Sequence, residues 1–424
     1  MPTLTTLPSG LRILVEELPH TYSIAIGAFI GAGARHESDP HAGAAHFIEH
    51  MLFKGTERYS TARLISQAVE GVGGYLNAST SYESTVYYAK VATIHFDRAL
   101  DVLAEMVQRP RFDLQELEKE RRVIIEEIRG IQDSPGDWVH ELVQEQTWHG
   151  SALGRDIAGS VATVGDLQRN DLTAFFQQHY HRKNMVISVA GNVRNDEVVA
   201  AVAQAFADLP AGPAYAAPTT PTPAPGPQVR LYSRETEQGN FCLGMPGLSF
   251  NDPDRRPLQV LDSILGGGMS SRLFQTLREE HGLAYSVGSY HSELSDVGGW
   301  VIYASVEPDA LRDAVTLAQD TLRDLAEHGP SADELLLVKE QVKGGIMLSL
   351  EDTWAVASRN GHNQLRYGYV VPVEQVVAEV EAVQAADVMR VARRLIRRDA
   401  MHLAVIGPYN EEDRSELEHL LREA

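Results

Sequence analysis

The two halves of this 424-residue chain repeat one order of strands and helices. The string VYYAKVATIHFDRALDVLAEM, which starts at Val86, aligns with VIYASVEPDALRDAVTLAQDT, which starts 215 residues later at Val301. A late strand that ends in glycine recurs in the same way, as ISVAGNV from Ile187 and LAVIGPY from Leu403. Matching strings at one nearly constant offset indicate an internal duplication. The chain is also too long for one ordinary core, so we predict two domains of one fold.

A proline-rich segment separates the two halves. Between Pro210 and Pro227 the sequence reads PAGPAYAAPTTPTPAPGP, with seven prolines, no charged residue and no helix or strand periodicity. Such a composition is typical of an extended, semi-rigid linker. We therefore place the N-terminal domain at residues 1–209, the linker at 210–228 and the C-terminal domain at 229–424.

Each half begins with a candidate strand, GLRILVEEL from Gly10 and QVRLYSRET from Gln228. Helical segments follow, and each half closes with a strand and a last helix. This order fits an α+β fold in which a mostly antiparallel sheet is covered by helices on one face. We predict two tandem domains of this kind, each an α/β roll.

Composition argues against several classes of partner. The chain has 37 Lys and Arg against 58 Asp and Glu, a formal net charge of −21. Such a surface repels nucleic-acid phosphates and anionic membranes, so we expect neither as a partner. The longest weakly polar run, Tyr22 to Ala34, has 13 residues, whereas crossing a bilayer takes about 20. The N-terminus lacks the basic start and apolar core of a secretory signal, and a single cysteine excludes internal disulfides, so we expect a cytoplasmic location.

The string HAGAAHFIEHMLFKG, from His41 to Gly55, carries two histidines one helical turn apart. On a helical wheel its apolar side chains form one stripe, which comprises Ala44, Ala45, Ile48, Met51 and Leu52. His46 and His50 lie on the opposite side, with Glu49 at their flank. Two imidazoles in this relation can chelate one metal ion, although the pair alone also fits a solvated polar face. With Glu49 the string reads H-x-x-E-H, an inverted zincin motif that favours zinc.

A zinc site with open chemistry needs a third protein ligand. The segment DLQELEKERRVIIEEIRGIQD, 113–133, predicts a helix with Asp113 as its N-cap. The apolar stripe of this helix comprises Leu114, Leu117, Ile124, Ile125, Ile128 and Ile131. Glu120 and Glu127 are seven residues apart, so they share a line beside this stripe, whereas Glu126 points into solvent. Spacing alone leaves open whether both are ordinary surface glutamates.

H-x-x-E-H followed 77 residues later by a glutamate in ERRVIIEEIRG resembles the inverted-motif zinc peptidases of the pitrilysin and insulin-degrading type, family M16. The resemblance is greatest to their mitochondrial-processing-peptidase branch and covers nearly the whole chain. The strings that carry it include AHFIEHMLFKGT, GGYLNASTSYESTVYYAK, LGRDIAG and GGGMSSRLFQTLREEHGLAYSVGSY. It implies the LuxS/MPP-like metallohydrolase fold in both halves.

The resemblance also implies roles for individual residues. His46, His50 and Glu127 would hold one zinc ion per chain, leaving a fourth position for water. Glu49 would take a proton from that water and deliver it to the leaving amine. Glu120 matches the accessory acidic residue of the family and would orient a ligand or the substrate.

Four further residues are implied as substrate-binding groups. Asn77 and Ala78 resemble an edge strand that pairs with an extended peptide, although Asn77 also fits a hairpin turn. Arg278 and Tyr285, in LREEHGLAYSV, resemble a pair that holds the substrate backbone or the developing oxyanion. Their alternative interpretation is a surface arginine and a half-buried tyrosine.

Projected through the repeat, His46 to His50 fall on Asp262 to Gly266, where no ligands stand, so we expect one site per chain. The glycine-rich string LGGGMSS, from Leu265, lacks the lysine of a P-loop. We predict a zinc metalloendopeptidase that cleaves short or unfolded peptides. The family's enclosed chamber takes four repeats, which implies a homodimer or a heterodimer with a related chain. The alternative is a non-catalytic scaffold or a partner subunit of a heteromeric processing peptidase.

Overall fold

The computed structural model describes residues 1–212 and 218–423, which form two compact units. The first unit comprises Met1–Ile128, Asp156–Thr219 and Ile346–Pro372, and the second comprises Arg129–Arg155, Thr220–Gly345 and Val373–Ala424. Residues 213–217 of the predicted linker lie outside the described residues. The described part of the linker that follows has neither helix nor strand before β7.

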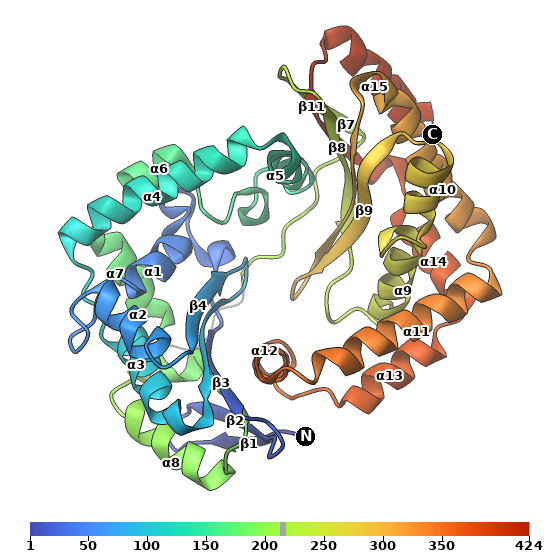
Figure 1. Cartoon of the computed structure of the whole chain (residues 1–424). Helices are drawn as coiled ribbons and strands as arrows, with labels where there is room; N and C mark the ends of the chain where they lie inside the picture. The colour runs from blue at the N-terminus through green and yellow to red at the C-terminus, as the bar shows by residue number, and fades with distance from the viewer. Residues whose placement is uncertain (213–217, 424) are drawn as a thin grey trace. The chain divides into compact units, whose positions relative to one another are not determined.

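A six-stranded sheet organises the described part of the first unit (Figure 1). Its strands are β1 Thr3–Thr6, β2 Arg12–Glu17, β3 Ser23–Ile30, β4 Tyr75–Thr80, β5 Thr85–Ala92 and β6 Met185–Gly191. They lie in the order β1-β2-β6-β3-β5-β4, and every pair is antiparallel except β2 with β6. The strand β4 therefore has one free edge.

The helices of the first unit bury apolar stripes against this sheet. They are α1 Ala44–Leu52, α2 Ala62–Glu70, α3 Phe96–Gln108, α4 Leu114–Asp133, α6 Val161–Asp166, α7 Arg169–His179, α8 Asn195–Ala205 and α12 Thr353–Tyr367, with the last turn of α4 belonging to the second unit. Ile24, Ile26 and Ala28 alternate along β3 and join the core beneath α1 and α3. This period of two is what a strand buried on that face requires.

The second unit repeats the plan around a five-stranded sheet of order β7-β11-β8-β10-β9. Its strands are β7 Gln228–Ser233, β8 Gly239–Gly247, β9 Ala284–Glu293, β10 Gly298–Val306 and β11 His402–Gly407. Its helices are α5 Pro135–Thr147, α9 Arg255–Gly266, α10 Leu311–His328, most of α11 Ala332–Ser349, α13 Val373–Ala382, α14 Ala385–Leu395 and α15 Glu411–Glu423, with a π-helix at Phe274–Glu280. The predicted α+β class, with two sheets of mostly antiparallel strands covered by helices, is confirmed.

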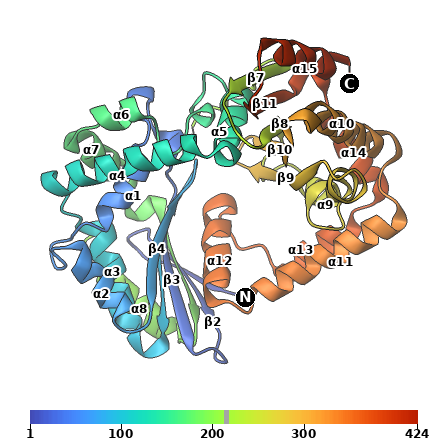
Figure 2. The same ribbon diagram turned by 45° about the horizontal axis from the view of Figure 1, so that its top comes forward.

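The expectation that helices cover only one face of each sheet is wrong. Helix α12, from the C-terminal half of the sequence, packs on β3 and β6 of the first sheet, on the face opposite α3 (Figure 2). There the ring of Phe29 stacks on Trp354 at 6.0 Å, and Ser188 donates a hydrogen bond to the carbonyl of Ala357. In the same way α5, from the N-terminal half, packs on β8 and β11 of the second sheet. The two halves thus exchange one helix each.

Among the described residues, none of the helices has the length and apolar content needed to cross a lipid bilayer.

Candidate metal centre

Helix α1 carries its two histidines on the face that the core leaves free. The five residues of the predicted stripe are all buried, and Phe47 is buried as well. The carboxylate of Glu37 accepts hydrogen bonds from the backbone N–H of Gly43 and Ala45, at 2.9 and 2.7 Å. This buried carboxylate caps the start of α1, where N–H groups lack helical partners. His46 and His50 remain half-buried on the other side.

Helix α4 starts as predicted, because Oδ1 of Asp113 accepts hydrogen bonds from the N–H groups of Gln115 and Glu116. Of the predicted stripe, Leu117, Ile124 and Ile128 are buried, whereas Leu114 is 62% exposed and does not belong to it. The first turn of α4 extends beyond the core, so the side chain of Leu114 is not packed against other apolar residues and stays exposed.

Arg121 fixes α4 beside α1, and its role was not visible in the sequence. Its guanidinium lies over the ring of Phe47 at 5.6 Å and donates hydrogen bonds to the carbonyls of Gly165 and Leu167. Only 9% of Arg121 is exposed. A buried guanidinium with these partners sets the register of α4 against its neighbours.

Three donor atoms from the two helices converge. Nε2 of His46 lies 3.9 Å from Oε1 of Glu127, and Nε2 of His50 lies 3.6 Å from Oε2. One ligand atom from each of the three residues lies within 4.8 Å of the others. In the described part of the chain no second group of three His, Cys, Asp or Glu side chains meets this condition.

The donor set fits zinc. A tetrahedral ion with bonds of about 2.0–2.2 Å holds its ligand atoms about 3.3–3.6 Å apart. The histidine nitrogens here lie 3.6 and 3.9 Å from different oxygens of Glu127. Burial, with a smaller contribution from His50, lowers the pKa of His46 to about 4, so its imidazole is neutral at neutral pH. Neutral imidazole is the form that binds metal. Two nitrogens and one carboxylate leave a position open for water or substrate.

Glu49 lies beside these three residues and is not one of them. It accepts a hydrogen bond from the hydroxyl of Thr80 at the end of β4. Burial raises the pKa of the Glu49 carboxyl, although the bond from Thr80 opposes that shift. A carboxylate of raised pKa beside a metal position suits proton transfer. Thr80 is a further residue that the sequence analysis did not identify.

Glu120 is a buried residue of α4 that contacts His50. Its Oε2 lies 3.1 Å from Nδ1 of His50, and its Oε1 lies 2.8 Å from Nζ of Lys54. Burial alone would raise the pKa of Glu120, but the bonds from His50 and Lys54 hold it below its usual value. Glu120 therefore contacts the candidate ligand His50 but is not one of the three residues that supply donor atoms. Glu127 is one of those three.

Two family models match the chain. Residues 12–161 match the model described as insulinase, peptidase family M16, and residues 166–342 match the one described as peptidase M16 inactive domain. Together they span more than half of the sequence.

The chain belongs to peptidase family M16. An uncharacterized zinc protease of Streptomyces coelicolor is 40% identical over 420 residues, covering 97% of this chain and 91% of that protein. An uncharacterized zinc protease of Bacillus subtilis, YmxG, is 40% identical over 407 residues, with 95% and 97% covered. The resemblance stated from the sequence motifs is thereby confirmed at the level of the M16 family.

Solved structures share the M16 fold. A crystal structure described as a peptidase M16 inactive domain from Pseudomonas fluorescens superimposes with a TM-score of 0.90 at 20% identity, covering 97% of this chain and 98% of that one. A protease from Helicobacter pylori gives a TM-score of 0.88 at 22% identity, with 96% and 99% covered. At these identities the likeness concerns the fold.

In this M16 chain the second repeat has a packed polar cluster at the positions that correspond to the candidate ligands His46 and His50. Asp262, the counterpart of His46, accepts hydrogen bonds from Ser289 at 2.6 Å and Trp300 at 2.8 Å, and lies 3.0 Å from Nδ1 of His291. Gly266 stands where His50 stands in the first repeat. A Cβ there would lie 2.2 Å from the backbone nitrogen of Ser289, so the position has no room for a side chain.

Asn77 and Ala78 lie in the edge strand β4, so the alternative of a hairpin turn is wrong for Asn77. Asn77 is paired with Tyr88 of β5, and its own Oδ1 accepts a hydrogen bond from the N–H of Ala78 at 2.8 Å. This bond uses the N–H of Ala78 within β4 itself. Whether a substrate pairs there stays a prediction.

Arg278 and Tyr285 are neighbours within the second unit. Arg278 donates a hydrogen bond to the carbonyl of Tyr285 at 2.8 Å, and its guanidinium lies 5.1 Å from the tyrosine ring. Tyr285 is 75% exposed, so the alternative of a half-buried tyrosine is wrong. Gly282, with φ of +65°, ends the helical segment as expected. Their role toward a substrate stays a prediction.

Proposed function

We propose that this M16 chain is a zinc-dependent metalloendopeptidase that hydrolyses short or unfolded peptides. The observation that carries the proposal is the convergence of His46, His50 and Glu127 with an ionisable carboxylate, Glu49, left outside the donor group. The relatives named zinc proteases support the metal and the reaction class.

In this proposal the residues of the site have separate roles in metal binding and in proton transfer. When bound by His46, His50 and Glu127, zinc supplies a Lewis acid that activates water and polarises the scissile carbonyl. Glu49 accepts a proton from the attacking water and delivers it to the leaving nitrogen, while Thr80 holds its carboxylate in place.

Other residues would bind the peptide and the ligands. The free edge of β4 at Asn77 and Ala78 offers backbone groups to an extended peptide, which selects little by side chain. Glu120 orients His50. By the family resemblance, Arg278 and Tyr285 bind the substrate backbone, and two chains form a dimer.

The test uses the purified chain, loaded with zinc, and a mixture of unstructured peptides analysed by mass spectrometry. We expect cleavage that a chelator abolishes and that added zinc restores. Glu49→Gln should keep stoichiometric zinc and lose cleavage, because the base is gone while the ligands remain. Cleavage that persists in the chelator or in this variant would refute the proposal.

Residues 166–342 match a model described as an inactive domain, and this observation favours a second candidate, a non-catalytic scaffold or partner subunit. A chain that binds zinc, forms a stable dimer and cleaves no peptide of the mixture would support this second candidate.

A further inference from the structure

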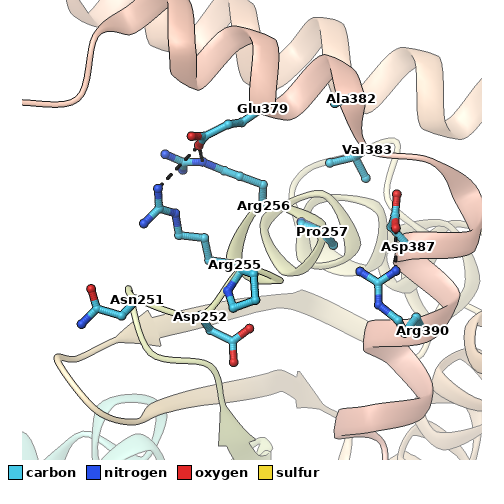
Figure 3. A pocket seen from close by; sticks show the side chains of 11 residues that line it. Asn251, Asp252, Arg255, Arg256, Pro257, Glu379, Ala382, Val383, Asp387 and Arg390 are labelled. Atoms are coloured by element: carbon cyan, nitrogen blue, oxygen red, sulfur yellow. Dashed lines mark hydrogen bonds and ion pairs between the residues drawn. The ribbon is translucent and has the colours of Figure 1, made fainter.

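A cavity of about 460 Å³ lies within the second unit, among the start of α9, the end of α13 and the start of α14 (Figure 3). Its volume falls in the range of pockets that hold small ligands, roughly 300–1,000 Å³. The apolar part of its wall comprises Pro253, Pro257, Ala382 and Val383. The cavity shares no residue with the metal centre.

One wall of the cavity has an excess of positive charge. Arg255 and Arg256 of α9 both approach the same oxygen of Glu379 on α13, at 3.5 and 3.0 Å. Among the charged groups that line this wall, two are cations and one is an anion. Arg256 donates from Nε to Glu379 and from Nη1 to Gln259. Its Nη2 donates no hydrogen bond within the described residues, so it is available to a ligand.

A second wall has an excess of negative charge. Arg390 of α14 bonds to Asp387 and Asp254, both at 2.5 Å, and Arg394 bonds to Asp252 at 2.7 Å and Asp254 at 3.2 Å. Of these groups, the carboxylates of Asp252 and Asp387 and the guanidinium of Arg390 line the cavity. The hydrogen bond from Arg390 lowers the pKa of Asp387, which is therefore ionised at neutral pH.

The two groups of charged side chains lie on different sides of the cavity, with Pro257 between them in the view of Figure 3. In Figure 3 Arg255, Arg256 and Glu379 gather on one side, and Asp387 and Arg390 lie on the other. The side chains of Arg255 and Arg256 are only 16% and 21% exposed. Solvent therefore screens their charge less than it would on an open surface.

A ligand that satisfies both walls carries one negative and one positive charge at its two ends. A sphere of the cavity's volume is about 10 Å across, and an extended peptide advances about 3.3–3.6 Å per residue. Two or three residues therefore span the distance, whereas the charges of a free amino acid are too close together.

We propose that this cavity binds a di- or tripeptide with free termini. The C-terminal carboxylate pairs with Arg255 and Arg256, where Arg256 Nη2 is available, and the N-terminal ammonium pairs with Asp252 and Asp387. The apolar wall accommodates small side chains between the two ends. This binding requires no cleavage and so goes beyond the proposed function, although short peptides are also the products of a peptidase.

The test is calorimetric titration of the zinc-loaded full chain with Ala-Ala and Ala-Ala-Ala, in the Glu49→Gln background to prevent hydrolysis. N-acetylated and C-amidated forms of the same peptides each remove one terminal charge. We expect saturable binding of the free peptides and at least tenfold weaker binding of either capped form. Equal binding of free and capped peptides, or no saturable binding, overturns the proposal.

Variants locate the site. Arg256→Gln should weaken binding of the free peptide about tenfold. This variant should also bind the free and the C-amidated peptides equally well. Asp387→Asn should bind the free and the N-acetylated peptides equally well. The helix α14 should stay intact in this variant, because the amide oxygen can still accept the hydrogen bond from the N–H of Gln384. Arg323→Gln, which loses an exposed pair with Asp320 on α10, is the matched control and should bind as the parent does. Binding that survives Arg256→Gln but is lost in Glu127→Gln places the peptide at the metal centre and overturns the proposal.

Discussion

Nδ1 of His50 lies 3.1 Å from a carboxylate oxygen of Glu120, whose other oxygen lies 2.8 Å from Nζ of Lys54. The ring of His50 is thereby held with its Nε2 toward Glu127, at 3.6 Å. An acceptor on the far nitrogen of a ligating histidine fixes both the tautomer and the orientation of the ring. We therefore expect Glu120 to act as a positioning residue for the candidate metal centre.

Replacing this acceptor should weaken metal binding. In Glu120→Gln, His50 loses its charged acceptor, and we expect zinc affinity to fall about 10- to 100-fold. Titration against a competing chromogenic chelator measures the change. Glu116→Gln, one turn earlier on α4, removes a carboxylate paired with Lys119 and should leave zinc affinity unaltered. Equal affinities in the two variants would show that Glu120 has no positioning role.

The neighbouring pair Glu126 and Glu127 tests the register of α4. Glu127 supplies a donor atom to the group with His46 and His50, whereas Glu126 is an exposed residue of the same turn. We expect Glu127→Gln to reduce bound zinc strongly under conditions in which Glu126→Gln keeps one ion per chain. Metal analysis after dialysis measures the bound zinc. A greater loss of zinc in Glu126→Gln than in Glu127→Gln would contradict the choice of Glu127 as the ligand.

The hydroxyl of Thr80 should matter for cleavage without affecting the metal. Thr80→Val removes the hydrogen bond to Glu49, which contributes about 1 kcal/mol. We expect peptide cleavage to fall by up to about tenfold at unchanged zinc content. Ser79→Ala, whose exposed side chain projects from the other face of β4, should cleave normally. A loss of zinc from Thr80→Val would assign Thr80 to metal binding instead.

Local patterns predicted which side chains of α1 and α4 lie beside their apolar stripes, and the family resemblance added the choice of Glu127 as the third candidate ligand. The wheel of α1 separated five core residues from His46 and His50, and the wheel of α4 separated Glu126 from Glu127. Asp113 was recognised because N-capping depends on residues close in sequence. Leu114 was misplaced because periodicity does not show where a helix extends beyond its core.

Long-range relations could not be predicted in this way. The periodicity of α12 shows which of its faces is apolar but not which sheet covers that face, so its exchange with α5 was missed. Thr80 and Lys54 reach the carboxylates of Glu49 and Glu120 across 31 and 66 residues of sequence. A single threonine or lysine has no local pattern that reports such a contact.

A final prediction concerns pH and the stability of the second unit. The carboxylate of Glu334, at the start of α11, pairs with Nε of Arg272 at 2.7 Å and with Nη2 at 2.9 Å. The bond from Arg272, opposed by burial, lowers the pKa of Glu334 to about 2, from 4.5. A folded-state pKa below the unfolded value stabilises the protein above pH 4.5, and this contribution is lost as the pH falls from 4.5 toward 2.

The shift would correspond to about 3 kcal/mol if it were fully expressed, but the side chain is 32% exposed. Allowing for solvent screening, we expect Glu334→Gln to lower the free energy of unfolding by about 1 kcal/mol at pH 7. The difference from the parent should shrink steadily between pH 4.5 and pH 3, as measured by denaturant unfolding at each pH. The control is Glu340→Gln, which breaks an exposed pair with Lys343 and should change stability by less than about 0.5 kcal/mol. A deficit in Glu334→Gln that stays constant down to pH 3 would mean that the Arg272 pair does not depress the carboxyl pKa.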